Sequence, residues 1–273
     1  MTITIRRNKD FTDLLNINLQ QRYEGRRRID DKVHVSDIIP TTCIRKQYFS
    51  RKHPEMDPIS SDSMHNFIRG EASEFVITNL VNIGVAQPDI ESDGIIAHPD
   101  VMVSNEVVIE LKDTLSGKRL DITDEKFRSY LRQLLYYLVI TSIEKGILSI
   151  RYNCKEFRWI RSDSEGDYYF KPRSGKEPGI ESWSVFLPKG DISREILKNE
   201  MVRRKNLFLN ALHKNDVSML PKLTERYRDN KCTLCKFYDL CMDNSNEEAD
   251  EAKEMANEID LFDISGVLDF KPL

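Results

Sequence analysis

Residues 95–112, with the sequence IIAHPDVMVSNEVVIELK, organise the fold of this 273-residue chain. Their apolar pattern predicts two strands, residues 95–103 and residues 107–111, the second extending through Lys112. Between them Ser104, Asn105 and Glu106 form a turn short enough for a β-hairpin. Because successive strand residues point to opposite faces, Val108, Glu110 and Lys112 share one face of this hairpin.

The polar residues of the hairpin indicate a catalytic site. If the turn is centred on Asn105, Asp100 faces Glu110, and facing residues have Cβ atoms ~5 Å apart. Two carboxylates this close repel each other unless a cation lies between them, and Lys112 lies over the same place. The pattern D-x9-E-x-K is therefore typical of divalent-metal hydrolysis of a phosphodiester. The competing interpretation is a solvated strand face, and a one-residue shift in register would move Asp100 to the wrong face.

The composition favours a cytoplasmic protein that binds nucleic acid. Charged residues make up 32% of the chain, and its net charge is −4. Residues 243–273 carry a net charge of −8, so the first 242 residues carry +4, which suits a nucleic-acid binder with an acidic tail. No signal peptide and no apolar run of about 20 residues is visible, so we expect neither export nor a membrane span. The five cysteines, an odd number, argue against a disulfide framework.

The rest of the chain predicts helices and strands in alternation. The longer helices are expected at residues 61–83, 123–143 and 192–213, and further strands at residues 146–153, 157–161 and 183–187. Loops are expected at residues 115–120 and 162–179. Shorter helices are expected within residues 11–19, near Ser36 as a cap, after Thr41 or Thr42 as a cap, and in the tail at residues 249–262. Gly70 interrupts the first long helix, which suggests a close approach of another segment.

The late cysteines form a second motif. Cys232, Cys235 and Cys241 are spaced C-x2-C-x5-C and need a fourth thiolate to complete a metal site. Cys43 is the best candidate because it lies at a helix start, where the helix dipole favours a thiolate. Cys154 ends a predicted strand and fits a small apolar residue better. A cubane iron–sulfur cluster accepts one distant and three adjacent ligands more readily than structural zinc does, although zinc stays open.

Together these motifs resemble the CRISPR-associated RecB-like exonucleases that carry an iron–sulfur cluster, within the PD-(D/E)XK nuclease superfamily. The resemblance covers residues 35–241 and rests on an ordered set: VSDI followed by Cys43 and Arg45, a helix with Gly70, HPD ending in Asp100, IELK with Glu110 and Lys112, Gln133 and Tyr137 as Q-x3-Y, and the three late cysteines. It implies an α/β fold, a mixed sheet flanked by helices. The expected parts are a basic extension (1–34), the nuclease core (35–215), an iron–sulfur segment (216–242) and an acidic tail (243–273).

The resemblance also implies a set of site residues. Asp100, Glu110 and the Leu111 carbonyl would bind Mg²⁺ or Mn²⁺, and Lys112 would orient the attacking water. Where the family usually has a histidine ligand, this chain has Glu74, with Glu71 as the alternative. Gln133 would position Lys112 or the water, and Tyr137 would contact DNA. Cys43, Cys232, Cys235 and Cys241 would hold a [4Fe-4S] cluster.

The implied activity is a single-stranded DNA exonuclease, often 5′ to 3′, that processes CRISPR spacer precursors with the integrase complex. Basic residues expected to grip DNA phosphates lie in residues 26–28, at Arg45 and Lys46 in the run 45–52, and at Arg203 and Arg204 in the run 203–205. Self-association into a homo-oligomer stays open. The competing hypotheses are an inactive DNA-binding scaffold and a zinc-containing regulator.

Overall fold

The computed structural model describes residues 9–25, 32–80, 83–116, 118–153, 157–161, 168–172, 179–223, 232–243, 249–250 and 252–253. Arg26–Arg28, Cys154 and most of the tail therefore lie outside the described residues. Within the described part of the chain, no helix is long and apolar enough to cross a membrane.

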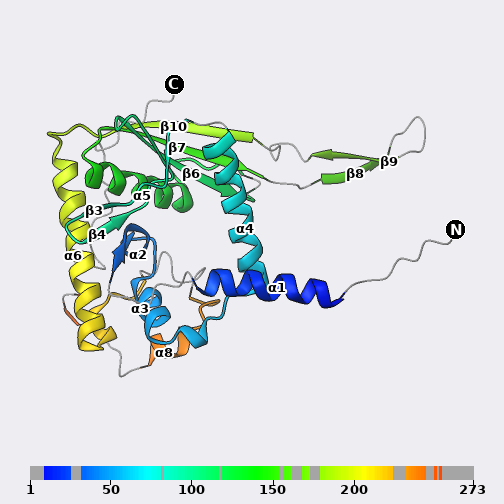
Figure 1. Ribbon diagram of the computed structural model, residues 1–273. Helices are drawn as coiled ribbons and strands as arrows, with labels where there is room; N and C mark the ends of the chain where they lie inside the picture. The colour runs from blue at the N-terminus through cyan, green and yellow to red at the C-terminus, as the bar shows by residue number, and fades with distance from the viewer. Residues whose placement is uncertain are drawn as a thin grey trace.

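The fold is mixed α/β, with helices around β-sheets, as predicted (Figure 1). The strands are β1 Val33–His34, β2 Val85–Ala86, β3 Ile90–Ser92, β4 Ile95–Ala97, β5 Val101–Val103, β6 Val107–Thr114, β7 Lys145–Tyr152, β8 Phe157–Arg161, β9 Tyr168–Pro172 and β10 Gly179–Phe186. The main sheet has the order β10-β7-β6-β5-β2, a smaller sheet has the order β1-β4-β3, and β8 pairs with β9 alone.

The helices surround these sheets. They are α1 Lys9–Glu24, α2 Val35–Ile38, α3 Ile44–Lys52, α4 Ser61–Phe75, α5 Glu125–Thr141, α6 Ile192–Lys214 and α8 Tyr238–Met242, with short turns η1 Pro54–Met56, η2 Val76–Leu80 and η3 Val217–Met219. In Figure 1, α1 and the β8–β9 hairpin both project from the body of the molecule, on the same side. The three long predicted helices are thus present, although the first changes to the π-helical turn η2 after Phe75.

The predicted hairpin is present at its turn but not along its whole length. Val103 pairs with Val107, and Ser104 and Asn105 both have positive φ, which closes a tight turn. The prediction of one strand over residues 95–103 is wrong. β4 belongs to the small sheet and β5 to the main sheet, and Pro99 lies between them. Proline has no N–H to donate to a sheet, so the chain changes partners there.

Helix α5 connects β6 to β7 and covers one face of the main sheet. The two strands are parallel, with Glu110 opposite Leu148 and Lys112 opposite Ile150. Parallel neighbours need a crossover of this kind, and α5 supplies it. Leu134 of α5 lies over Gly146, where a Cβ atom would meet the leucine methyl groups at 3.1 Å. Gly146 therefore allows the helix to pack closely on the sheet.

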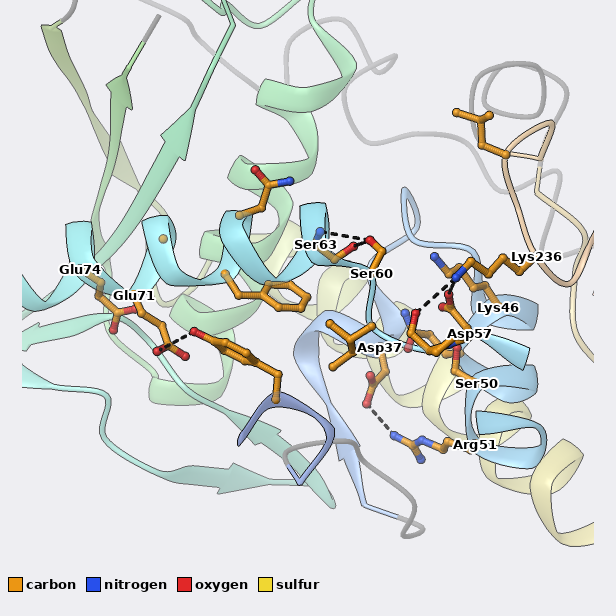
Figure 2. Close-up of a pocket in the computed structure, with 18 residues that line it drawn as sticks. Asp37, Lys46, Ser50, Arg51, Asp57, Ser60, Ser63, Glu71, Glu74 and Lys236 are labelled. Carbon is orange, nitrogen blue, oxygen red and sulfur yellow. Dashed lines mark hydrogen bonds and ion pairs between the residues drawn. The ribbon is translucent and has the colours of Figure 1, made fainter. Parts of the chain in front are cut away.

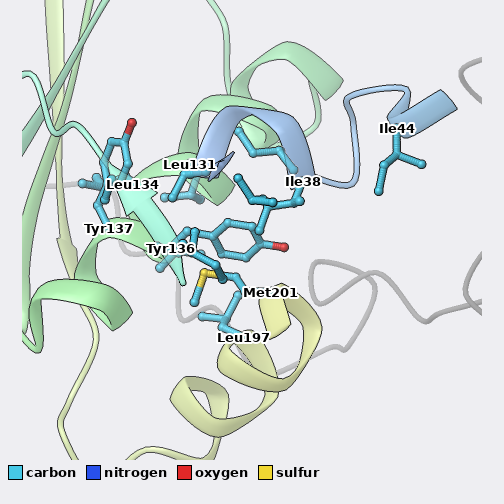
Figure 3. Packing of buried hydrophobic residues seen from close by; sticks show 14 of the residues in the cluster. Ile38, Ile44, Leu131, Leu134, Tyr136, Tyr137, Leu197 and Met201 are labelled. Atoms are coloured by element: carbon cyan, nitrogen blue, oxygen red, sulfur yellow. The ribbon is translucent and has the colours of Figure 1, made fainter. Parts of the chain in front are cut away.

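The core joins α5 to α2, α3 and α6. Figure 3 shows its central side chains, which are Ile38, Ile44, Leu131, Leu134, Tyr136, Tyr137, Leu197 and Met201. Full burial of an aliphatic or aromatic side chain of this size contributes about 1.5–3 kcal/mol. A buried polar link adds to it, because the Arg132 guanidinium donates to the Glu200 carboxylate at 2.6 Å and so ties α5 to α6.

Several local predictions were wrong. Ser36 lies inside α2, whose N-cap is His34, and α3 is capped by Cys43 rather than by Thr41 or Thr42. The expected loop at residues 162–179 contains strand β9. A Cβ atom at Gly70 would meet nothing within 4 Å, so no neighbouring segment approaches it closely.

Substitution of Gly146 by Val should reduce the free energy of unfolding by about 1–3 kcal/mol, because the added atoms press on Leu134 in a packed core. Urea unfolding monitored by circular dichroism measures the change. Gly190→Val is the control: a Cβ there meets nothing within 4 Å, so the change should stay within about 0.5 kcal/mol. Equal stability of the two variants would contradict the close packing of α5 on β7.

Candidate active site

Asp100 and Glu110 are held together by the hairpin as predicted. The register pairs Val101 with Ile109, so the next pair outward brings Asp100 opposite Glu110. The backbone N–H of Leu111 donates to Asp100 Oδ2 at 2.6 Å, which fixes the carboxylate against β6. Burial raises the pKa of Asp100, while Lys112 and the Leu111 N–H act in the opposite direction. The two acidic residues therefore occupy one buried place.

Glu110 is the least solvated carboxylate of this site. Its exposed fraction is 0%, and burial raises its pKa to about 8 against the attraction of Lys112. Apart from the ion pair with the Lys112 ammonium, neither carboxylate oxygen has a hydrogen-bond partner among the described residues. Buried carboxylate oxygens without a hydrogen-bond partner reduce the stability of the fold unless a cation is close. The residue therefore has free acceptor capacity for a positively charged group.

Lys112 supplies the positive charge of the site in this structure. Burial alone would lower the pKa of its ammonium group, but the charges of Glu110 and Asp100 outweigh burial, so the pKa is raised. The ammonium also donates to Gln133 Oε1 at 3.1 Å and lies 5.4 Å from the centre of the Tyr130 ring. Lys112 therefore stays charged and is held from two sides.

Helix α5 supports this lysine through a short hydrogen-bonded chain. Gln133 and Tyr137 are one helical turn apart, and the Gln133 amide donates to the Tyr137 hydroxyl at 2.8 Å. The amide orientation leaves the Gln133 oxygen free to accept from Lys112. Tyr137 is only 4% exposed, so the expectation that it contacts DNA is wrong for this structure. Its position instead orients Gln133.

The structure distinguishes the two helical glutamates. Glu74 accepts a hydrogen bond from Gln87, and burial, followed by the charge of Asp100, raises its pKa. Glu71 instead accepts from the Tyr23 hydroxyl at 3.2 Å. Glu74 is therefore the glutamate that belongs to the charged group of the site. Gln87 was not predicted, because it lies in a loop with a φ of 44° and carries no motif.

The donor set fits a hard divalent cation, although it is not closed around one. Beyond burial, the charge of Asp100 raises the pKa of Glu74, and Asp100 and Glu74 both raise the pKa of Glu110. The three side chains offer only oxygen ligands, which suit Mg²⁺ or Mn²⁺. In the described residues, no three His, Cys, Asp or Glu side chains are arranged as a metal site. Lys112 explains the difference, because its ammonium contacts Glu110 where a cation would bind.

A pocket of about 910 Å³ opens beside Glu74. Figure 2 shows it following α4 from Glu74 past Ser63 and Ser60 to Lys46 and Lys236 near the cysteine segment. Gly70 lines this pocket, so the missing side chain leaves open space rather than a close contact. Of the three carboxylates, Glu74 lines this elongated polar pocket, whereas Asp100 and Glu110 are not among its lining residues.

Two of the predicted DNA-binding residues are structural. Arg45 is 0% exposed, and its Nε donates to the Leu220 carbonyl at 2.8 Å. Arg204 is buried as well, and its Nε donates to the Ile38 carbonyl at 2.5 Å. Neither side chain can reach a phosphate, so these two predictions are wrong. Lys46 is exposed at the pocket and Arg203 is partly exposed, so both stay candidates.

The four predicted cluster cysteines lie near one another. The charges of Cys241, Cys235 and Cys232 all act on Cys43, although 188 residues separate Cys43 from Cys232 in the sequence. Burial is the largest effect on the Cys43 thiol and raises its pKa to about 11, so the expected thiolate at the helix start is wrong for this structure. Four free cysteines are a donor set that suits iron or zinc, although in the described residues their thiols are not arranged as a metal site.

Comparison with known proteins gives a fold and no family. No family model matches the chain, and no curated protein matches it in sequence. The solved structure of SSO0001 is similar, with a TM-score of 0.50 at 17% identity over 85% of this chain and 96% of that one. A phage-related exonuclease from Haemophilus somnus 129PT is more distant, with a TM-score of 0.40 at 10% identity over 67% of this chain and 96% of that one. The alkaline exonuclease LHK-Exo from Laribacter hongkongensis has a TM-score of 0.36 at 15% identity over 68% of this chain and 89% of that one.

The burial of Glu110 predicts a pH dependence of stability when divalent ions are absent. Its pKa is about 8 in the folded chain and about 4.3 in an unfolded one. The folded state therefore binds more protons between these values, and stability should fall as pH rises from about 5 to 8, by at most about 1.4 kcal/mol per pH unit. Urea unfolding in EDTA at several pH values measures this fall.

Glu110→Gln should show a shallower fall than the unchanged protein, since glutamine does not titrate. Glu106→Gln is the matched control, because Glu106 lies exposed in the turn between β5 and β6 and should leave the slope unchanged. A slope that is the same in all three proteins would show that Glu110 does not titrate in this window.

Proposed function

We propose that this chain is a metal-dependent nuclease that hydrolyses DNA phosphodiester bonds. The observation that carries the proposal is the convergence of Glu74, Asp100 and Glu110 on Lys112. Of these residues, Glu74 lines an open pocket. Three carboxylates grouped around one lysine are an unfavourable arrangement for stability alone, because like charges repel one another. Such perturbed groups beside a pocket mark a functional site more often than a structural one.

Each residue has a role that follows from its position. Glu74, Asp100 and Glu110 would hold Mg²⁺ or Mn²⁺, with the Leu111 carbonyl as a further ligand. When bound, this ion supplies charge to polarise the scissile phosphate and to acidify a water molecule. Lys112 lies beside the carboxylates and offsets negative charge that develops on the phosphate.

The residues of α5 act through Lys112. Gln133 holds the ammonium group by its amide oxygen, and Tyr137 holds the Gln133 amide in the required orientation. Both are positioning residues here, because Gln133 contacts Lys112 and Tyr137 contacts Gln133. A site of this kind depends on such supporting contacts for its geometry.

The finer activity rests on the resemblance of the motifs. It favours an exonuclease that acts on single-stranded DNA, 5′ to 3′, and that prepares spacer precursors for the CRISPR integrase. A DNA-binding scaffold with weak or absent activity is the second candidate. One observation favours the scaffold: the described carboxylates do not form a ready-made metal site while Lys112 is paired with Glu110.

Glu110→Ala should reduce Mg²⁺- or Mn²⁺-dependent cleavage of end-labelled DNA by about 100-fold or more, because the buried ligand is lost. Single-stranded substrates labelled at either end also give the polarity. Glu106→Ala should cleave like the unchanged protein, since Glu106 lies exposed in the turn between β5 and β6. Full activity of Glu110→Ala would overturn the site, and an inactive unchanged protein that still binds DNA would favour the scaffold.

We include a [4Fe-4S] cluster on Cys43, Cys232, Cys235 and Cys241 in the proposal. Its support is the donor set, four free cysteines whose charges act on one another across the two ends of the chain. Thiolate ligands of this number suit a cubane cluster. A cluster there would tie α3 to the segment that contains α8.

Cys43→Ala should remove visible absorbance and bound iron, and it should lower stability. A cluster that links two distant parts of the chain restricts the conformations of the unfolded state. In the analogous case of a disulfide, this effect raises the free energy of unfolding by up to about 5 kcal/mol. Iron content and absorbance of protein purified without oxygen give the answer, with Cys154→Ala as the control that should keep its iron. Stoichiometric zinc without iron in the unchanged protein would rule out the cluster.

A further inference from the structure

A second group of charged residues lies at the end of β6, directly after Lys112. Asp113 accepts from Arg69 Nε of α4 at 2.6 Å and from Arg151 Nε of β7 at 2.8 Å. Its side chain is only 5% exposed, whereas those of Arg69 and Arg151 are 28% and 35% exposed. One carboxylate is thus shared by two guanidinium groups that remain open to solvent.

A third cation, Lys126, lies beside this pair. Its ammonium donates to Thr114 Oγ1 at 2.8 Å. Partial burial lowers the pKa of Lys126, and the positive charge of Arg69 lowers it further, while Asp113 acts in the opposite direction. Arg69, Lys126, Arg151 and Asp113, here called the cationic cluster, therefore hold three positive charges and one negative charge. This surplus is self-repelling, and a bound anion would relieve it.

The place of Lys126 in its helix is also unfavourable for stability. Lys126 is the second residue of α5, in the first turn, where the helix dipole disfavours a cation. The structure offers it a hydroxyl oxygen and a distant ring rather than a carboxylate partner.

The cationic cluster adjoins the proposed active site. Both lysines lie over the Tyr130 ring, with Lys112 Nζ 5.4 Å and Lys126 Nζ 6.0 Å from its centre. Arg69 precedes Gly70 on the helix that also carries Glu74. A nucleic-acid strand that places one phosphate at Lys112 brings its next phosphate close to the cationic cluster, because the charges along a strand are closely spaced.

We infer that the cationic cluster binds the phosphate next to the scissile one, with Lys126 as the residue that contacts it. This inference rests on the proposed function and deepens it, since it gives the substrate strand a second anchoring point. Lys126 is a substrate-binding residue in this scheme. Arg69 and Arg151 add to the positive field and are fixed by Asp113.

The test compares two lysines that carry the same charge. In a Glu110→Ala background with EDTA, which prevents cleavage, binding of a fluorescein-labelled single-stranded oligonucleotide is followed by anisotropy at several salt concentrations. Lys126→Gln should weaken binding about tenfold at low salt, and the slope of log affinity against log salt should become shallower by about 0.7, as for one lost phosphate contact. Lys126→Arg should restore both values.

Lys118→Gln is the control. Lys118 is 68% exposed and pairs with Asp124 at 2.9 Å, so its loss removes the same charge from the same end of the sheet without touching the cationic cluster. Its slope should match that of the background protein.

A Lys126→Gln effect no larger than that of Lys118→Gln would overturn the inference. Circular dichroism checks the fold, and Lys126→Gln should be at least as stable as the background protein. If the unchanged protein binds DNA in this way but cleaves nothing with Mg²⁺ or Mn²⁺, the nuclease proposal fails and the phosphate site stands.

Discussion

The ion pair between Glu110 and Lys112 is the contact on which the site depends. A fully buried carboxylate is costly, and it is tolerated only with a cation nearby. The two residues are neighbours on one face of β6, so the strand itself holds them together. Gln133 then prevents the ammonium from moving into solvent. The arrangement keeps charge where packing alone would exclude it.

Three separate elements converge on this ion pair, and each fixes one group. In β6, the N–H of Leu111 orients Asp100, which directly precedes β5. Helix α5 presents Gln133, and helix α4 brings Glu74 beside these groups. Groups on regular helices and strands are held more firmly than groups on loops. The open end lies at α4, where the pocket reaches Glu74. Rigid walls and one accessible side suit a site that receives an extended substrate.

The sequence predicted those parts of the site that depend on local periodicity. A tight turn and strand alternation were enough to bring Asp100 opposite Glu110, and helical spacing placed Gln133 beside Tyr137. Burial was not predictable in the same way. Arg45 and Arg204 stand in basic runs that look solvent-exposed, yet both donate to backbone carbonyls from elsewhere in the chain. Only tertiary contacts decide whether such a charge meets solvent or a carbonyl.

Arg45 also bears on how the cysteines are assembled. Its guanidinium donates to the carbonyls of Leu220, at 2.8 Å, and Cys241, at 3.5 Å. The Phe49 and Phe237 rings stack nearby, with centroids 5.7 Å apart. A buried guanidinium is stable only with such acceptors, so α3 and the cysteine segment constrain each other through protein contacts. Protein contacts therefore bring the two cysteine-bearing parts of the chain together, although the described thiols are not arranged as a metal site.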